Sequence, residues 1–177
     1  MEEMKRPSKN EYYLDIAKAV SERSTCLRRR YGAVVVKDDV IVSTGYNGAP
    51  RGVVNCSEIG CLKDLVGAPH FSGYDYCLGV HAEENAIINA ARYGAKVLGG
   101  ILYLYGEDAK TNEVCEGLPC PRCRRVLINA GITNVITKRA DGYIINFNVQ
   151  TWIDEESKNY KQKVAEAKCN KQLTSCL

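Results

Sequence analysis

Histidine is scarce in this chain, because its 177 residues include only two, His70 and His81. Also missing is any apolar run long enough to span a membrane. The opening stretch, MEEMKRPSKN, is charged where a secretion signal has an apolar stretch. These absences argue against a membrane protein and a secreted protein, and we expect a cytoplasmic location.

A large excess of charge of one sign is likewise absent. The 24 lysine and arginine residues against 21 aspartate and glutamate residues leave a net charge of +3. Nucleic-acid-binding domains carry a strongly basic surface or stripe, which this sequence lacks. We therefore expect neither a nucleic-acid nor a membrane partner, although a local group of arginines can still bind a phosphate.

Cysteine, in contrast, is abundant, with nine residues in the chain. Disulfides are rare in a reducing compartment, so bridges between these cysteines are not expected there. Metal binding is the leading interpretation, and buried free thiols are the alternative.

Hydrophobic periodicity predicts an α/β layered domain, with helices and strands alternating along the chain. Ser8 and Glu11 form an S-x-x-E capping signature ahead of the first helix. The predicted elements are, in order, a helix at 9–23, a strand hairpin at 33–36 and 40–43, an irregular segment at 52–79, a helix at 81–93, a strand at 100–105, a polar loop at 106–118, a helix from Pro121 to Gly131, strands at 132–137 and 143–147, and a helix at 152–168. We expect one domain over 1–177, with its core at about 9–150 and a C-terminal helix and tail at about 151–177.

Three residues together offer metal ligands: His81, Cys120 and Cys123. One imidazole and two thiolates make a three-ligand zinc site that leaves the fourth tetrahedral position open. Cys120 and Cys123 flank the start of a predicted helix, whose N–H groups and dipole favour thiolates. This donor set predicts a catalytic metal centre.

Glu83 lies two residues after His81 and completes the pattern H-x-E followed by P-C-x-x-C, here HAE and PCPRC. A zinc ion with an open position activates water, and a carboxylate that is not a ligand can transfer its proton. Water attack with proton transfer describes hydrolytic deamination of a nucleobase, and this pattern is typical of zinc-dependent nucleobase deaminases. Either part of this pattern alone is weak evidence for a deaminase. H-x-E arises by chance, and C-x-x-C could be half of a zinc ribbon.

Further segments match one family, in family order, over roughly residues 10–140. They are STCLRRRYGAVVV, IVSTGYNGAPRG, NCSEIGC, YDYCLGVHAEENAIINAARYGA, PCPRC and INAGITNVI. On these segments the chain resembles the deoxycytidylate (dCMP) deaminase family of the cytidine deaminase-like superfamily. GYNGxPxG ahead of HAExNAI favours this family over tRNA adenosine deaminases and free-nucleoside enzymes.

The resemblance implies a three-layer α/β/α fold with a mixed five-stranded sheet. It implies conversion of dCMP to dUMP and ammonia, a step that supplies the precursor of dTTP. It also implies that His81, Cys120 and Cys123 hold the catalytic zinc ion and that Glu83 is the proton shuttle.

Substrate contacts and regulation are implied in the same way. By resemblance, Asn47 hydrogen-bonds the deoxyribose and the backbone of Ala82 contacts the base. Many family members are homohexamers that dCTP activates and dTTP inhibits, which implies a homohexamer and these effectors with Mg²⁺. The alternatives are a deaminase of dCTP or deoxycytidine, or a zinc-stabilised binding module without catalysis. Glu83 argues against the last, because a structural site needs no proton shuttle.

A second group of cysteines has the spacing of a structural zinc site. Its members are Cys26, Cys56, Cys61 and Cys77. Four thiolates would complete the coordination sphere and pin the segment 52–79 against the domain. The resemblance supports this second zinc ion, because some family members carry one in this neighbourhood. Four reduced thiols are the alternative, and His70 could replace one of the cysteines as a ligand.

Arginines near the matched segments are candidates for binding the nucleotide phosphate, because a guanidinium group pairs well with phosphate oxygens. The preferred candidates are Arg28, Arg29 and Arg51, and Arg122 is a further one. A solvated basic surface is the alternative for each of them.

The chain departs from the family pattern between LYLYG and LPC, where EDAKTNEVCEG intervenes. The family passes from this strand to PC within a few residues. The extra loop adjoins the predicted active site and so bears on substrate choice, while its Cys115 is expected to be a bystander thiol. The strand tyrosines Tyr103 and Tyr105 are assigned to the core rather than to stacking on a base.

Overall fold

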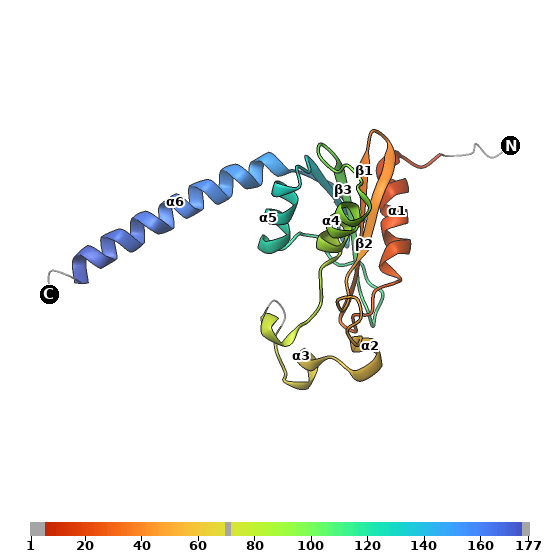
Figure 1. Ribbon diagram of the computed structural model, residues 1–177, viewed down its shortest axis with the longest axis horizontal. Coiled ribbons are helices and arrows are strands. Elements are labelled where there is room, and N and C mark those ends of the chain that lie inside the picture. The colour runs from red at the N-terminus through yellow and green to blue at the C-terminus, as the bar shows by residue number, and fades with distance from the viewer. Residues whose placement is uncertain (1–5, 70–71, 175–177) are drawn as a thin grey trace.

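A five-stranded mixed sheet forms the centre of the computed structural model, which describes residues 6–69 and 72–174, with side chains as far as Cys169 (Figure 1). Its strands are, in spatial order, β2 (Val40–Tyr46), β1 (Arg29–Lys37), β3 (Ile101–Asp108), β4 (Asn134–Lys138) and β5 (Ile144–Asn148). The β3–β4 pair is parallel, and the other pairs are antiparallel. The expected mixed sheet is thereby confirmed.

Helices cover both faces of this sheet. α1 (Lys9–Ser21) packs on one face, and α4 (Ala82–Tyr93) and α5 (Pro121–Asn129) lie on the other (Figure 1). The core is accordingly divided into two clusters of buried residues, one on each side of the sheet. This is the three-layer α/β/α arrangement that the sequence predicts.

Alternation along β1 divides the core between the two faces. Val35 packs on the α4 side, and Val34 packs on the α1 side. Two glycines let the helices approach the sheet closely. A Cβ on Gly32 would lie 2.0 Å from a backbone oxygen of α1, and a Cβ on Gly45 would lie 2.2 Å from a backbone nitrogen of α4.

The first helix begins as its sequence signature predicts. Ser8 Oγ accepts a hydrogen bond from the backbone N–H of Glu11 at 3.2 Å, and the N–H of Ser8 donates to Glu11 Oε2 at 2.7 Å. These two bonds complete the capping box. The helix ends at Ser21, short of the predicted end, so Cys26 lies in the connection between α1 and β1.

The segment 52–79 is less irregular than predicted. It contains α2 (Cys56–Ile59), α3 (Leu62–Leu65) and a 3₁₀ turn, η1 (Tyr74–Tyr76). Helices this short leave no periodic hydrophobic pattern in the sequence, which is why they escape prediction. Among the described residues of the segment only Lys63 is buried, so little apolar packing holds it to the domain.

Strand β3 continues through Glu107 and Asp108, where the sequence predicts a polar loop. Glu107 pairs with Val114, so residues 106–115 form a hairpin that extends the sheet. Glu107 is 5% exposed and lies 2.6 Å from the guanidinium group of Arg30. The prediction of a loop is wrong for 106–108 and holds for most of 109–118. A charged residue usually marks a solvated position, and here a salt bridge allows the burial of Glu107.

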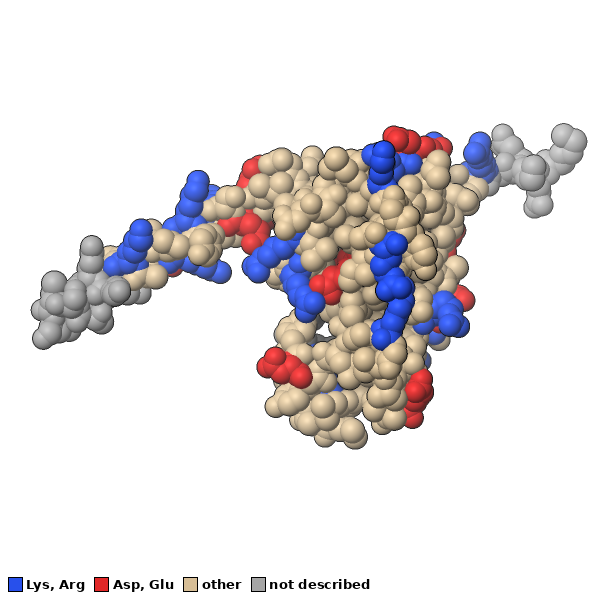
Figure 2. Space-filling view, in the orientation of Figure 1, with Lys and Arg blue, Asp and Glu red and all other residues tan. Residues whose placement is uncertain are grey.

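Helix α6 (Val149–Thr174) is longer than the predicted helix at 152–168. Its first turns pack on the domain through the buried Trp152, whose ring centre lies 5.0 Å from the Arg124 guanidinium carbon. The remainder projects away from the sheet (Figure 1), with acidic side chains near its start and basic side chains farther along (Figure 2). Among the described residues, no helix combines the length and the apolar character needed to cross a membrane.

Candidate active site and metal centre

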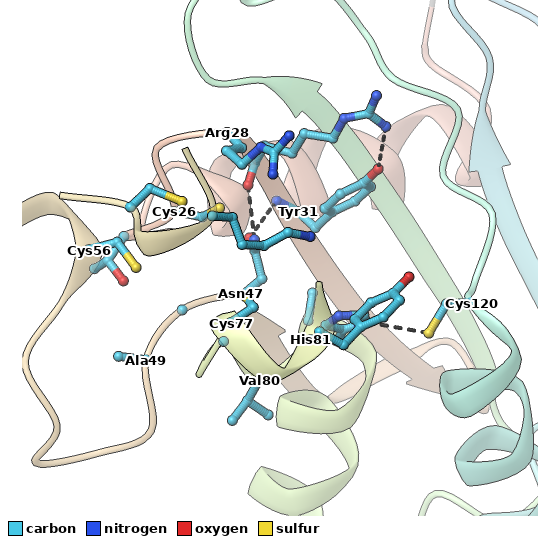
Figure 3. Close-up of a pocket in the computed structure, with 18 of the residues that line it drawn as sticks. Cys26, Arg28, Tyr31, Asn47, Ala49, Cys56, Cys77, Val80, His81 and Cys120 are labelled. Carbon is cyan, nitrogen blue, oxygen red and sulfur yellow. Dashed lines mark hydrogen bonds between the residues drawn. The ribbon is translucent and has the colours of Figure 1, made fainter. Parts of the chain in front are cut away.

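His81, Cys120 and Cys123 meet in space as their spacing predicts, and we call them the metal cluster. Cys120 Sγ lies 3.5 Å and Cys123 Sγ lies 3.3 Å from His81 Nδ1. The three ligand atoms lie within 4.8 Å of one another, and in the described part of the chain no other group of three or more histidine, cysteine or acidic residues does so. In Figure 3 a dashed line joins His81 to the Cys120 sulfur at the edge of a pocket.

Two helix N-termini position the metal cluster. His81 is the N-cap of α4, Cys120 is the N-cap of α5, and Cys123 lies in the first turn of α5. Pro121 at the start of α5 has the backbone angle that the first helical turn requires and has no N–H group to leave unpaired. The positive dipole end and the free N–H groups of a helix start favour thiolate ligands.

The two thiols of the metal cluster differ in their affinity for a proton. The hydrogen bond with the Cys123 thiol lowers the pKa of Cys120 to about 3, and the bond with His81 acts in the same direction against burial. The bond with Cys120 raises the pKa of Cys123, and burial adds to this shift. Its bond with Cys120 raises the pKa of His81.

Glu83 lies in the first turn of α4 and is not one of the three clustered ligands. Its side chain is buried, and this burial raises the pKa of its carboxyl group. A hydrogen bond with Cys123 and the charge of His81 oppose the shift, which places Glu83 next to the metal cluster. A carboxyl group that is not a ligand can accept a proton from a metal-bound water molecule and pass it on.

A cavity of about 200 Å³ opens beside the metal cluster (Figure 3). Its walls come from the start of β1, the loop after β2, the segment 52–79 and the start of α4. Ala82 and Glu83 both line it, together with His81 and Cys120. A molecule in this cavity therefore meets the metal cluster and the predicted proton shuttle at once.

Asn47 lines the cavity and fastens two of its walls together. Its Oδ1 accepts from the backbone N–H of Tyr31 at 2.7 Å, and its Nδ2 donates to the carbonyl of Arg29 at 2.9 Å. These bonds join the loop after β2 to the start of β1. Because the amide nitrogen carries two hydrogens, the predicted contact with a deoxyribose is compatible with them.

Two of the three arginines predicted to bind substrate line the cavity, Arg28 and Arg29. Arg28 Nε lies 3.3 Å from a carboxylate oxygen of Asp64, which ties this guanidinium to the segment 52–79. Arg29 Nη1 donates to the hydroxyl of Tyr31 at 3.4 Å. Both arginines thus line the cavity that the metal cluster adjoins, and guanidinium groups suit an anionic part of a substrate.

Arg51, the third, does not line this cavity, against expectation. It faces a separate hollow of about 470 Å³, and its guanidinium donates to Asn89 Oδ1 at 2.6 Å. That hollow is also lined by Arg23 and Arg92. Nearness to the GYN motif is misleading, because the chain turns after Pro50 and leaves the cavity wall. Arg122 is exposed and pairs with Glu84 at 2.7 Å.

The four remaining cysteines of the predicted structural site, which we call the outer cysteine group, line the same cavity. They are Cys26 before β1, Cys56 at the start of α2, Cys61 at the N-cap of α3 and Cys77 after η1. Burial raises the pKa of Cys56, and the other three thiols add to the shift. The group therefore gathers in one region, yet its sulfurs do not meet the distance limit that the metal cluster meets. His70 lies outside the described residues.

Among the other residues that line the cavity, and that the sequence patterns do not single out, are Tyr31 and Lys63. Strand alternation offers a signal for Tyr31, because it lies two residues from Arg29 and hence on the same face of β1. Lys63 lies in a four-residue helix and has no such signal. Tyr103 and Tyr105 belong to the core on the α1 side, as predicted.

Residues 7–139 match the sequence model of a family described as the cytidine and deoxycytidylate deaminase zinc-binding region. The chain belongs to this family. The match includes every residue of the metal cluster and Glu83, and a donor set of one imidazole and two thiols fits Zn²⁺.

Individual relatives agree with the family assignment. The deoxycytidylate deaminase of Mycobacterium phage D29 is 39% identical over 138 residues, which cover 75% of this chain and 96% of the phage protein. The deoxycytidylate deaminase of Schizosaccharomyces pombe is 36% identical over 131 residues, covering 74% of this chain and 37% of that protein. The chain therefore matches nearly all of one relative and little more than a third of the other.

A solved structure shares the fold. The crystal structure of dCMP deaminase from the cyanophage S-TIM5 in complex with dCMP and dUMP superposes with a TM-score of 0.54 and is 27% identical. The superposition covers 76% of this chain and 84% of the cyanophage chain.

Proposed function

We propose that this protein converts dCMP and water to dUMP and ammonia, with its metal cluster holding zinc and Glu83 transferring protons. The observation that carries the proposal is the placement of a buried, non-ligand carboxyl group beside a three-ligand cluster at one cavity. The relatives named deoxycytidylate deaminase, and the cyanophage structure with dCMP and dUMP, support the choice of substrate.

Zinc bound by the cluster would supply an activated water molecule at its open position. Glu83 would pass one proton of the attacking water to the ring nitrogen of cytosine, and would then pass the proton of the new hydroxyl group to the amino group, which leaves as ammonia. Burial suits Glu83 to this exchange, because its raised pKa keeps the protonated form accessible. The main chain at Ala82, which is fully buried at the cavity, would hold the base in place.

The monophosphate would bind Arg28 and Arg29, which both line the cavity. Asn47, which lines it as well, would contact the deoxyribose. Arg51 has no part in this arrangement, because it faces the separate hollow.

The outer cysteine group would hold a second, structural zinc ion. Its gathering around one wall supports this proposal, and so does the scarcity of apolar packing in the segment that carries three of its members. A metal that binds all four thiolates would replace the missing core as the source of order.

We extend the proposal to regulation and assembly. dCTP and dTTP, each with Mg²⁺, would act as effectors in a homohexamer located in the cytoplasm. The hollow lined by Arg23, Arg51 and Arg92 supports an effector site, because clustered guanidinium groups suit a triphosphate. A reducing cytoplasm agrees with two sites built from free thiols.

Product formation tests the proposed function directly. Purified protein of measured zinc content is incubated with dCMP, dCTP or deoxycytidine, and the products are separated by chromatography. dUMP from dCMP, at a rate well above that of deoxyuridine from deoxycytidine, is expected, and added dCTP should increase the rate. Turnover of dCTP or deoxycytidine instead would assign another substrate. No turnover in a zinc-loaded sample would favour a binding module.

A further inference from the structure

Tyr31 stands beside the arginine that we assign to the substrate phosphate. Arg29 and Tyr31 occupy alternate positions of β1 and line the same cavity. The hydroxyl oxygen of Tyr31 accepts a hydrogen bond from Arg29 Nη1 at 3.4 Å, as the dashed line to a guanidinium group shows in Figure 3. This bond restrains a side chain that otherwise has several rotatable bonds.

The Tyr31 ring is itself held in place by its surroundings. Asn47 accepts from the Tyr31 N–H and donates its own backbone N–H to the Tyr31 carbonyl at 3.2 Å. The ring lies over Gly106, where an added Cβ would come within 2.2 Å of Tyr31 Cε1. Only a glycine at this position leaves room for the ring. Burial also raises the pKa of Tyr31, so the phenol stays protonated and neutral near neutral pH.

The hairpin at 106–115 fixes the strand on either side of Arg29. The backbone N–H of Ala109 donates to the carbonyl of Arg28 at 3.1 Å. The guanidinium of Arg30 pairs with the buried Glu107 at 2.6 Å on the other face of the sheet. The start of β1 is thus held by the hairpin at 106–115, most of which belongs to the extra loop EDAKTNEVCEG.

We propose that Tyr31 is a positioning residue, which orients the Arg29 guanidinium toward the phosphate and so makes the site prefer a nucleoside monophosphate to the free nucleoside. This inference rests on the proposed function, since it takes dCMP as the substrate. Tyr31 acts through Arg29 and takes no part in the proton transfers. The segment 106–115 supports the effect by presenting Gly106 to the ring.

The test uses the full-length, zinc-loaded protein and four variants: Tyr31→Phe, Arg29→Ala, the double variant, and Tyr143→Phe as a matched control. Phenylalanine keeps the ring that packs on Gly106 and removes only the hydroxyl group. Tyr143 is 73% exposed between β4 and β5 and does not line the cavity. KM and kcat are measured for dCMP and for deoxycytidine, and the Kd of dUMP and of deoxyuridine is measured by calorimetry.

We expect Tyr31→Phe to raise the KM for dCMP about 3- to 10-fold and to leave kcat within about 2-fold. Its kcat/KM for deoxycytidine should not change. Arg29→Ala should raise the KM for dCMP further, and the double variant should match Arg29→Ala alone, because the hydroxyl acts only through that guanidinium. The Kd of dUMP should follow the KM of dCMP, while the Kd of deoxyuridine stays constant.

Three outcomes would overturn the proposal: an unchanged KM for dCMP, an equal loss for deoxycytidine, or a Tyr31→Phe effect that adds to that of Arg29→Ala. Failure of the wild-type protein to deaminate dCMP would refute the proposed function instead. In that case the dUMP and deoxyuridine measurements still decide whether Tyr31 strengthens phosphate binding.

Discussion

The metal cluster and the outer cysteine group present similar donor atoms on different kinds of backbone. Every member of the metal cluster lies at the start of a helix, α4 or α5, that contributes buried residues to the core on the α4 side of the sheet. The outer group lies in connections and in helices of four residues or fewer, and three of its members belong to the segment 52–79, whose described part buries only Lys63. Only the first set brings its ligand atoms within 4.8 Å of one another in the described structure.

This difference shows how much of a metal site the protein scaffold can prepare. Buried helix packing holds the residues of the metal cluster in place, so the scaffold itself brings these ligands together. The outer cysteine group lacks such packing. A metal ion would have to neutralise its thiolates and also hold the surrounding chain in one conformation. The cluster should therefore control activity, and the outer group should control stability. The following predictions test that division, from the largest expected effect to the smallest.

Loss of a ligand in the metal cluster should have the largest effect. Cys123 is fully buried, and Cys123→Ser replaces a thiolate with a hydroxyl group that binds zinc poorly. We expect kcat/KM for dCMP to fall by about 10⁴-fold or more, together with the loss of about one zinc ion per chain. Steady-state kinetics and elemental analysis measure both. A variant that kept its zinc and its activity would remove Cys123 from the site.

Loss of the proposed proton shuttle should come next and should separate activity from metal binding. Glu83→Gln keeps the shape of a buried side chain but cannot take up a proton. We expect kcat to fall about 10³-fold while the zinc content stays that of the wild type. Glu84→Gln is the matched control, because Glu84 is also buried on α4 but pairs with Arg122. Equal losses in both variants would mean that the start of α4 is disturbed in general, with no special role for Glu83.

The contrast between the two regions also shows what a sequence can reveal. Strong local rules determine the two helices at 81–93 and 121–129. The first has an N-cap residue and ends at Gly94 in the left-handed conformation, with φ of 70°. The second has an N-cap residue followed by a proline. Those rules are sufficient by themselves to place His81, Cys120 and Glu83 at helix starts. The metal cluster was predictable because local structure determines most of its geometry.

Other features depend on contacts between distant segments, and the sequence did not reveal them. Arg51 follows the GYN motif but faces a different hollow after the turn at Pro50. The sequence pattern predicts Glu107 to lie in a polar loop. The residue is buried instead, because it forms a salt bridge with Arg30 from another strand. The positioning of Tyr31 by Gly106 likewise joins residues of two strands, and neither residue signals the other.

Loss of a ligand in the outer cysteine group should affect stability more than catalysis. We expect Cys61→Ser to remove the second zinc ion and to lower Tm by about 3–8 °C, with kcat/KM for dCMP reduced by less than about 10-fold. Cys169→Ser is the matched control, because Cys169 is exposed on α6, far along the chain from both sites. Differential scanning calorimetry and elemental analysis are the measurements. Equal zinc content in Cys61→Ser and the wild type would show that the outer group binds no metal.

The smallest effects should come from the ion pairs that flank the two regions. Arg122 is 77% exposed where it pairs with Glu84, so Arg122→Ala should change kcat/KM by less than about 3-fold and Tm by less than about 2 °C.

Arg28 is only 16% exposed where it pairs with Asp64, and α3 has little other support. Asp64→Ala should therefore lower Tm more than Arg122→Ala does, and a thermal melt compares the two directly. The reverse order would mean that the metal cluster depends on surface electrostatics rather than on helix packing, which would undo the contrast drawn between the two regions.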